Sequence, residues 1–364
     1  MAVFALQFLV TNVLFSLLIT LGFLRLDTAR LHRAPRLLLY SLGLGPITTT
    51  LILYYLLLIF PHQSDVFYVA VVGAVFACLA VGGRREWSRL GKEFKALADN
   101  VRLRFSKANP SAKAGTAAYM FALMAALSVF LFVYLTRTIH VPLEDSDALK
   151  YGTLGKILHQ EKSMEYRWIG TYPRTGFYQV INQAPSFSLL LTWEEMTGGF
   201  FGTDQDLYFK STSAYYALLI IAFIIAELAR RSKAVAAAAA AALISAFPFF
   251  ITLIQQHLDS YRIFFVVVSW ICLEWAVDKA DVLSFIALGV FSGFAAFAHS
   301  IGAIFALFNI VAYAVFSKGG WSARWRRTGV LAGLVFAFGW IHYLLDIVWG
   351  FGWILFKRNH TYWG

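Results

Sequence analysis

YMFALMAALSVFLFVYL (residues 119–135) is an apolar run suited only to a lipid bilayer, and HVPLEDSDALKYGTLGKIL (residues 140–158) follows it almost at once. The second stretch places three acids, Glu144, Asp145 and Asp147, within four residues. The chain has 364 residues, of which 59% are hydrophobic and 14% charged, whereas soluble domains carry about 25% charged residues. The composition predicts a polytopic membrane protein with carboxylates clustered at the mouth of one membrane helix.

The spacing of the apolar runs predicts the fold class. A transmembrane helix needs about 20 apolar residues, and only a helix or a closed barrel satisfies the backbone polar groups of a span in lipid. We therefore expect an all-α, polytopic transmembrane helix bundle with about ten spans. The expected spans lie near residues 3–23, 37–60, 66–82, 117–136, 212–229, 234–254, 263–277, 282–299, 301–317 and 328–350.

The distribution of basic residues predicts the orientation. Lysine and arginine collect in cytoplasmic loops. With the N-terminus outside, the predicted inner loops hold 21 of the 31 Lys and Arg residues, and the short outer turns 61–65 and 255–261 hold none. The acidic cluster is then expected on the non-cytoplasmic side. Topology thereby accounts for the net charge of +11, and no nucleic-acid partner is expected.

Two parts of the chain are predicted. Residues 1–116 form an N-terminal three-helix membrane extension, whose last segment, at about residues 86–107, has the spacing of an amphipathic helix on the cytoplasmic surface. Residues 117–364 form the membrane core, which includes the long outer loop 137–211. A loop of that length is uncommon unless it carries structure or function of its own.

The outer loop is expected to contain two short interfacial helices. Apolar periodicity predicts the first at residues 146–162, with Ser146 suited to capping its N-terminus. The second is predicted at 184–196, where Pro185 suits the first helical turn. The second, of about 13 residues, is too short to span a bilayer and is expected to lie along the membrane surface.

Other ionisable residues gather near the predicted outer ends of helices. His257, Asp259 and Arg262 share one short turn, and His299 stands at a break predicted at HSIG, residues 299–302. The outer side also carries the cations Lys150, Lys156, Lys162, Arg167, Arg174 and Lys210. From these residues alone, two interpretations stay open: solvated side chains that cap helices, or a site for an anionic ligand.

The order of these features resembles the C-type glycosyltransferases, membrane enzymes that include protein O-mannosyltransferases and lipid A aminoarabinose transferases. These enzymes use polyprenyl-phosphate-linked sugars, and many carry an acid–acid–x–x–Tyr pattern in the first outer loop. Here Asp147-Ala-Leu-Lys-Tyr151 keeps the spacing from Asp to Tyr but has Ala148 at the second acid. APSFSLLL (184–191) is similar to the family's His-Pro-Pro-Leu stretch.

Two later stretches extend the resemblance, which covers about residues 117–317. HLDSYRIFFVVVSWICLEWA (257–276) is similar to the family's later Asp followed by an apolar helix. GVFSGFAAFAHSIGAIF (289–305) resembles a Gly-rich helix that ends in Lys in many members, with His299 in that place.

The resemblance implies an inverting sugar transfer at the outer face, with one carboxylate as base because the donor is already activated. Asp147 is the expected catalytic base, and Asp145 is its rival. Four cationic residues are expected to bind the donor phosphate: Arg262, His257, Lys150 and His299. Three further residues are expected to orient these groups or to contact the acceptor: Asp259, Glu144 and Tyr151.

The implied cofactor and partners follow from the same chemistry. A divalent cation shared by Asp145, Asp147 and Asp259 is left open, since hard cations take oxygen ligands and many family members need none. The expected partners are a polyprenyl-phosphate sugar donor, a glycan, lipid or protein acceptor, and membrane lipids. The expected location is an integral membrane one, above all a bacterial inner (plasma) membrane, with the active site on the non-cytoplasmic side.

Three alternatives remain. The first is a membrane transporter or flippase, which places charges near the bilayer midplane; here Glu227, Glu274, His342 and Asp346 lie toward the ends of predicted spans. The second is a polysaccharide polymerase or O-antigen ligase, which also has a large outer loop. The third is a structural membrane subunit, for which Asp147 would have no effect on any activity.

Overall fold

The computed structural model describes residues 2–26, 41–88, 91–92, 95–96, 99, 128, 146–164, 171–172, 177–178, 184–198, 206–231, 259–279, 282–345 and 347–348. This part is all-helical apart from one two-residue hairpin, in which β1 (Thr171–Tyr172) pairs antiparallel with β2 (Phe177–Tyr178). The predicted all-α class is therefore confirmed for these residues. The spans expected at 117–136 and 234–254, and most of the amphipathic helix, lie outside the described residues.

The first predicted span is one continuous rod. It consists of α1 (Ala2–Phe8), the π-helical turn η1 (Leu9–Leu14) and α2 (Phe15–Leu26). One side of the rod is polar and buried, and it is made of Gln7, Thr11, Asn12, Ser16 and Thr20. In an apolar rod, buried polar groups need hydrogen-bond partners, so this stripe determines what the rod packs against.

Three residues of the polar stripe have partners far away in the sequence. Gln7 Nε2 donates to the backbone oxygen of Glu194 at 3.0 Å, and Trp193 Nε1 donates to Thr11 Oγ1 at 3.0 Å. Tyr208 donates its hydroxyl to Asn12 Oδ1 at 2.7 Å. These bonds join the N-terminal rod directly to residues 193–208, in the second half of the predicted outer loop. The division of the chain at residue 116 stays a prediction.

The next two helices form an antiparallel pair joined by a tight turn. α4 (Leu44–Ile59) is followed by α5 (Asp65–Gly82), whose start is capped by the Ser64 hydroxyl, which accepts from the Phe67 N–H at 3.3 Å. The buried residues of α5 recur every fourth position, at Tyr68, Val72 and Phe76. A helix with so narrow a buried stripe and apolar residues on its other sides is suited to a lipid environment.

The two predicted short helices are present. α8 (Ser146–Glu161) and α9 (Ser186–Gly198) match the expected ranges closely, and α9 begins directly after Pro185. α10 (Leu207–Arg231) follows. Nearly every residue of α9 is buried, so this helix lies inside the bundle and does not present one face to its surroundings. The interfacial placement of α8 and α9 remains a prediction.

The remaining helices form a second packed group. α13 (Asp259–Lys279) contacts α14 (Val282–Ala298) and α15 (Ser300–Phe316). His299 separates the latter two, which confirms the break predicted at HSIG. α16 (Trp321–Val335), the π-helical turn η4 (Phe336–Trp340) and α17 (Ile341–Leu345) complete the described chain as one interrupted rod.

Several described helices can cross a membrane by length and composition. The five long ones are Ala2–Phe23, Asp65–Gly82, Leu207–Ile224, Asp259–Asp278 and Trp321–Leu345. Three apolar helices are shorter: Leu44–Ile59, Val282–Ala298 and Ser300–Phe316. Buried serines and threonines and exposed Val, Ile and Phe side chains reinforce this. The chain is thus consistent with an integral membrane protein, and the number of spans and their orientation remain predictions.

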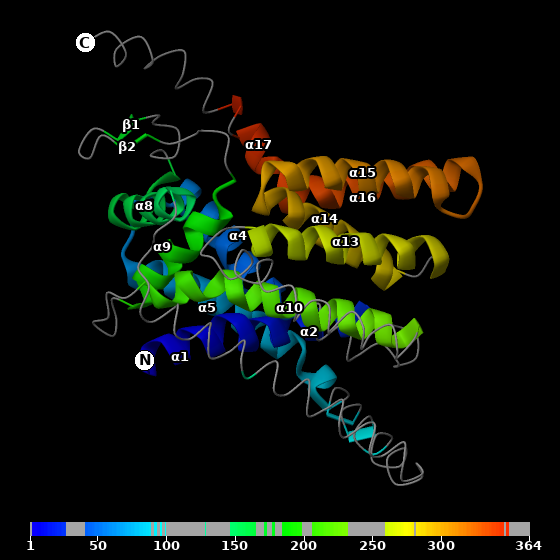
Figure 1. Cartoon of the computed structure of the whole chain (residues 1–364), viewed down its shortest axis with the longest axis horizontal. Coiled ribbons are helices and arrows are strands. Elements are labelled where there is room, and N and C mark those ends of the chain that lie inside the picture. The colour runs from blue at the N-terminus through cyan, green and yellow to red at the C-terminus, as the bar shows by residue number, and fades with distance from the viewer. Residues whose placement is uncertain are drawn as a thin grey trace.

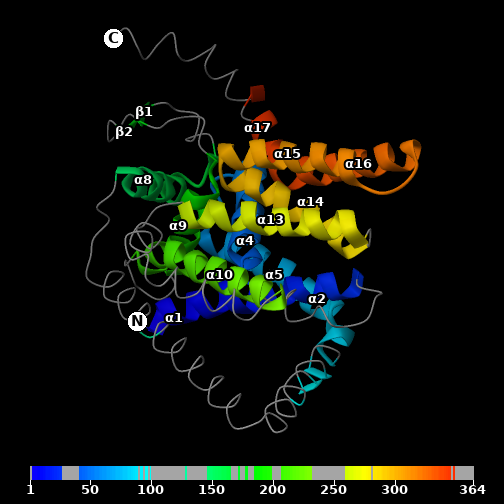
Figure 2. The same ribbon diagram turned by 45° about the vertical axis from the view of Figure 1, so that its right-hand side comes forward.

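The ends of several helices that carry predicted site residues lie at the same end of the bundle. In both views, the start of α10, the start of α13 and the break between α14 and α15 lie toward the end of the bundle that carries α8 and α9 (Figure 1, Figure 2). The turn between α15 and α16 lies at the opposite end. The segments that carry the sequence-predicted site residues therefore share one end of the molecule.

Candidate functional site

Three of the predicted site residues contact one another. Asp259 begins α13, and Arg262 lies one turn later on the same face. Their side chains form an ion pair, with Arg262 Nη2 2.5 Å from Asp259 Oδ1. Arg262 Nη1 lies 3.3 Å from Nε2 of His299, which comes from the break between α14 and α15. The guanidinium thus links a carboxylate on its own helix to an imidazole 37 residues away.

The fold fixes the orientation of the His299 ring. His299 has an extended backbone (φ −164°, ψ 153°) and caps α15, its Nδ1 accepting from the Ile301 N–H at 3.0 Å. Both ring nitrogens of His299 therefore face N–H donors, the Ile301 N–H at Nδ1 and the Arg262 guanidinium at Nε2. A guanidinium has donors only, and which ring nitrogen accepts depends on the tautomer of His299. The remaining donors of the Arg262 guanidinium suit the oxygens of an anion.

The surroundings of this triad combine partial exposure with an apolar surface. The Arg262 and Asp259 side chains are 29% and 34% exposed, so a ligand can reach them. Ile301 and Ile304, on the first turns of α15, are exposed large apolar residues, at 45% and 69%. A polar group and an apolar tail on one ligand could therefore both find complementary surface near His299.

An aromatic bridge connects the triad to α8. Tyr151 is buried and meets Phe187 of α9 edge-on, with ring centroids 5.5 Å apart. Phe187 lies 5.7 Å from Tyr261, the residue before Arg262. The starts of α8 and α13 are therefore neighbours across α9. Position 147 falls one turn before Tyr151 on the same face of α8 by helical register.

Several predicted site residues cannot be placed. Glu144, Asp145 and His257, and the side chain of Asp147, lie outside the described part of the chain. Lys150 is described and half-buried on α8. The proposed roles of these residues stay predictions. Among the residues that the structure describes, no group of three His, Cys, Asp or Glu side chains could hold a metal ion; two of the three predicted ligands are outside that set.

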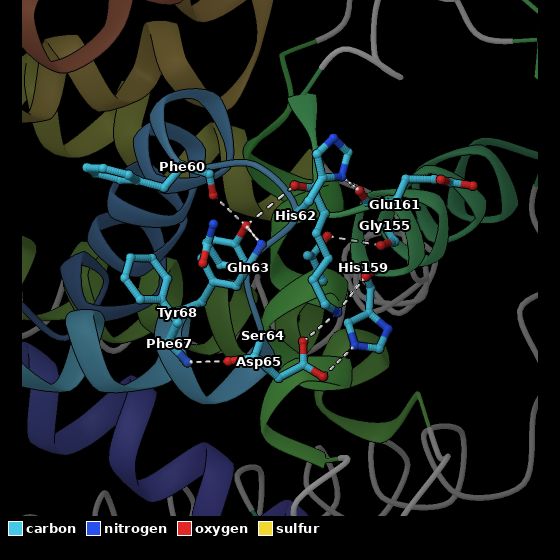
Figure 3. Close-up of polar contacts among 12 residues, drawn as sticks. Phe60, His62, Gln63, Ser64, Asp65, Phe67, Tyr68, Gly155, His159 and Glu161 are labelled. Carbon is cyan, nitrogen blue, oxygen red and sulfur yellow. Dashed lines mark hydrogen bonds and ion pairs between the residues drawn. The ribbon is translucent and has the colours of Figure 1, made fainter.

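A second polar cluster ties the turn between α4 and α5 to the end of α8 (Figure 3). Asp65 lies at its centre, with Oδ1 2.6 Å from Lys162 Nζ and Oδ2 3.3 Å from His159 Nε2. The His62 N–H donates to the Lys162 oxygen at 2.8 Å, and the His62 ring bonds the Glu161 oxygen at 2.9 Å. We call these five residues the outer clasp, after the predicted side of the loop that carries α8.

The backbone of the outer clasp is conformationally unusual. His62 and Lys162 both have left-handed backbones, with φ of 60° and 49°. This region is uncommon for residues other than glycine and costs about 1 kcal/mol or more each. The two residues face each other through the hydrogen bond from His62 N–H to the Lys162 oxygen. The clasp therefore holds two strained turns against each other.

The clasp and a second ion pair revise the interpretation of the outer cations. Lys162 pairs with Asp65, and Lys156 lies 3.2 Å from Asp206 and 3.9 Å from Glu195. These two lysines neutralise carboxylates of the chain itself, so an anionic ligand is not needed to explain them. The anion-binding interpretation is thereby confined to other cations. Among the described residues, Arg262 also pairs with a carboxylate, that of Asp259, but its Nη1 lies beside His299 and its side chain is 29% exposed.

A buried carboxyl joins α9 to α10. Glu194 Oε1 accepts from the Tyr208 N–H at 2.7 Å and Oε2 from the Phe209 N–H at 2.8 Å, at the start of α10. Helix N-termini favour such acceptors. Burial nevertheless raises the pKa of Glu194 to about 8, with Asp206 and Glu195 acting in the same direction and the two N–H donors lowering it.

Sequence reasoning missed Glu194, Asp65 and His159. The hydrogen-bond and ion-pair partners of these three residues lie in distant segments of the chain, so no local sequence pattern predicts the contacts. The buried polar stripe of the N-terminal rod did have a signal, because Gln7, Thr11 and Ser16 recur at helical spacing within an apolar run.

Comparison of the chain with protein-family models, with curated proteins and with solved structures finds no match. The functional argument therefore rests on the residues and geometry described above.

Proposed function

We propose that the chain is an integral membrane glycosyltransferase that transfers a sugar from a polyprenyl-phosphate donor to an acceptor at the end of the bundle formed by α8, α13 and the start of α15. The observation that carries this proposal is the placement of the Arg262 guanidinium, whose Nη2 lies 2.5 Å from Asp259 Oδ1 and whose Nη1 lies 3.3 Å from His299 Nε2. A phosphate oxygen beside the guanidinium would accept from its remaining donors. The resemblance of the sequence to the C-type glycosyltransferases supports the same assignment.

The expected reaction is an inverting displacement. The acceptor hydroxyl loses its proton to Asp147, or to its rival Asp145, while its oxygen forms a bond to the anomeric carbon. The bond from that carbon to the phosphate oxygen breaks, and its electron pair leaves with the polyprenyl phosphate. Arg262 and His299 stabilise the charge that develops on this leaving group.

Asp259 is proposed to orient the phosphate-binding cation. Its carboxylate holds Arg262 Nη2 at 2.5 Å, which leaves Nη1 directed at His299. A guanidinium can bridge a carboxylate and a phosphate at once because its five donors lie in one planar fork. Tyr151 is buried against Phe187, so it is proposed to position the start of α8 and not to touch the acceptor.

The site also suits a donor with an isoprenoid tail. The exposed Ile301 and Ile304 begin an apolar face of α15 immediately after His299. A tail lying along that face would hold its phosphate at the depth of the Arg262 guanidinium. The expected location of the enzyme is a membrane, with the site on the non-cytoplasmic side.

The test is transfer by the purified protein from a panel of radiolabelled polyprenyl-phosphate sugars. Asp147→Asn is expected to lose about 10²-fold or more in turnover, and Arg262→Gln to weaken donor use while Arg262→Lys retains part of it. Asp278→Asn, an exposed acid at the far end of α13, serves as the matched control. It should transfer like the wild type.

Two results would reject the proposal. If Asp147→Asn and Asp145→Asn both keep full turnover, neither carboxylate is the base. If the wild type binds polyprenyl phosphate but transfers no sugar from any donor, the enzyme assignment fails, and a lipid flippase becomes the better interpretation.

A further inference from the structure

The turn between α15 and α16 carries a concentrated positive charge. Lys318, Arg324, Arg326 and Arg327 lie within ten residues. The chain has no acidic residue between Asp281 and Asp346, and none of the four cations forms an ion pair with any residue that the structure describes. A basic cluster without internal counter-charges is a binding surface for anions.

Two exposed tryptophans stand in the same turn. Trp321 and Trp325 are 72% and 51% exposed and lie one helical turn apart, with ring centroids 5.4 Å apart in an edge-on contact. Contiguous exposed apolar side chains mark surfaces that contact a membrane or a partner. Tryptophan is enriched where a membrane meets water, since its ring is apolar and its N–H is polar.

The turn borders apolar, exposed surface on both of its helices. Val315 and Phe316 end α15 with 58% and 68% exposure, and Val330 continues α16 at 53%. Arg324 Nη1 reaches back only to the Val315 oxygen, at 3.5 Å. A ligand that fits here has an anionic head beside the arginines and apolar chains along α15 and α16.

The turn is open to such a ligand. Gly319 has φ of +128°, a conformation that glycine adopts without strain. Nothing lies within 4 Å of the position that a Cβ atom would take on Gly319 or Gly320. A headgroup can therefore approach the backbone of the turn at these two glycines.

We infer that the α15–α16 turn binds the headgroup of an anionic phospholipid, with Arg324, Arg326 and Arg327 on the phosphate and Trp321 and Trp325 at the level of the headgroup. A phosphodiester matches the planar donors of arginine. The lipid is favoured over a soluble anion because the cations are flanked by exposed apolar residues on both helices. This site lies at the opposite end of the bundle from the proposed transferase site (Figure 1) and does not depend on that function.

The test uses the full chain, purified in detergent and mixed with brominated phosphatidylglycerol or brominated phosphatidylcholine. Bromine quenches nearby tryptophans, so the difference in fluorescence between wild type and Trp321→Phe/Trp325→Phe reports this turn alone. Quenching by phosphatidylglycerol is expected at concentrations about tenfold or more below those needed with phosphatidylcholine. Arg324→Gln/Arg326→Gln/Arg327→Gln is expected to abolish that preference.

Two matched variants protect the interpretation. The triple Arg→Lys variant keeps the charge and should keep part of the preference, which separates the effect of the charge from that of the arginine side chains. Arg84→Gln/Arg85→Gln/Lys92→Gln removes the same charge from exposed cations elsewhere, and it should quench like the wild type. Purified protein in micelles has no sidedness, so an altered insertion direction does not affect the readout.

The proposal is overturned if the two lipids quench equally, or if the control triple variant loses the preference as fully as the turn variant does. It is also overturned if millimolar inorganic phosphate displaces phosphatidylglycerol completely, because the turn would then bind a free anion and not a lipid.

Discussion

Lys162 Nζ lies 2.6 Å from Asp65 Oδ1, and this ion pair joins the first residue of α5 to the residue that follows α8. Its position matters because α8 carries position 147 and Tyr151 near its other end. Helices of the N-terminal part of the chain thereby brace the helix that holds the proposed base. The proposed site depends on both parts.

The outer clasp should contribute measurably to stability. Asp65→Asn removes the partner of Lys162 and of His159, whose side chains are 19% and 23% exposed. Because these groups are partly solvated, we expect a loss of about 1 kcal/mol. The apparent unfolding temperature in detergent should fall by a few degrees. Hydrogen exchange at residues 155–164 should accelerate, whereas Asp278→Asn should leave both readouts unchanged. Equal effects of the two variants would contradict a role for the clasp.

The clasp should also make stability depend on pH. Burial lowers the pKa of His159 below its ordinary 6.5, and Lys162 acts in the same direction, while Asp65 opposes both. The folded state therefore resists protonation of this ring. The resulting stabilisation is fully present above pH 6.5 and is lost as the pH falls through the lowered folded-state pKa.

His159→Gln provides the measurement for that effect. Unfolding temperatures recorded from pH 7.5 down to about 5 should fall less steeply for the variant than for the wild type. His159→Asn, a second neutral replacement, should show the same reduced slope. A wild-type slope in His159→Gln would show that another group titrates.

The helices were largely predictable from sequence because their signals are local. Pro185 and the apolar run after it predicted α9, and the HSIG interruption predicted the boundary between α14 and α15. Each signal acts within one or two turns of the residue that carries it. Such patterns are the ones that a single sequence expresses most clearly.

The contacts between helices were not predictable in the same way. From the sequence alone, Lys162 is interpreted as a solvated outer cation. Its partner Asp65 lies 97 residues earlier in the chain, and only the fold places the two side chains together. Glu194 reads as one of two acids in a short helix, although its role depends on N–H groups at Tyr208 and Phe209. The Arg262–Asp259 pair follows from i,i+3 spacing, whereas the approach of His299 depends on how α13 packs against the α14–α15 break.

Glu194 is expected to stabilise the fold most at acid pH. Burial raises its folded-state pKa from 4.5 to about 8, so between these values the folded state binds more protons than the unfolded one. Stability from this group is complete below about pH 4.5 and is lost as the pH rises toward 8. The direction is opposite to that of His159, so the two residues can be separated experimentally.

Glu194→Gln tests this assignment. The amide nitrogen cannot accept a hydrogen bond, so one backbone N–H of α10 loses its acceptor, at a cost of about 1–3 kcal/mol near pH 6. The deficit should shrink as the pH rises through 8, since only the wild type then buries a charge. Unfolding temperatures of both proteins between pH 6 and 9 measure the deficit. A constant deficit in Glu194→Gln between pH 6 and 9 would contradict the raised pKa.

Gly155 is expected to be required for the close packing of α8 on α9. Thr192 Oγ1 donates to the Gly155 oxygen at 3.0 Å. A Cβ atom at this position would lie 2.6 Å from the Ser188 oxygen and 2.8 Å from Leu191 Cβ. The first neighbour is backbone and cannot move alone, so Gly155→Ala should force α8 away from α9. Overpacking of this kind costs about 1–3 kcal/mol.

Gly329→Ala is the control, and it should change the stability of the protein in the opposite direction to Gly155→Ala. Gly329 lies inside α16 with nothing within 4 Å of its Cβ position, so Gly329→Ala should stabilise the helix by about 0.5–1 kcal/mol. Thermal unfolding in one detergent compares the two variants directly. If the proposed function is correct, Gly155→Ala should also lower sugar transfer, because position 147 shifts with α8, whereas Gly329→Ala should not. A Gly155→Ala protein as stable as the wild type would mean that α8 does not pack on α9 as described.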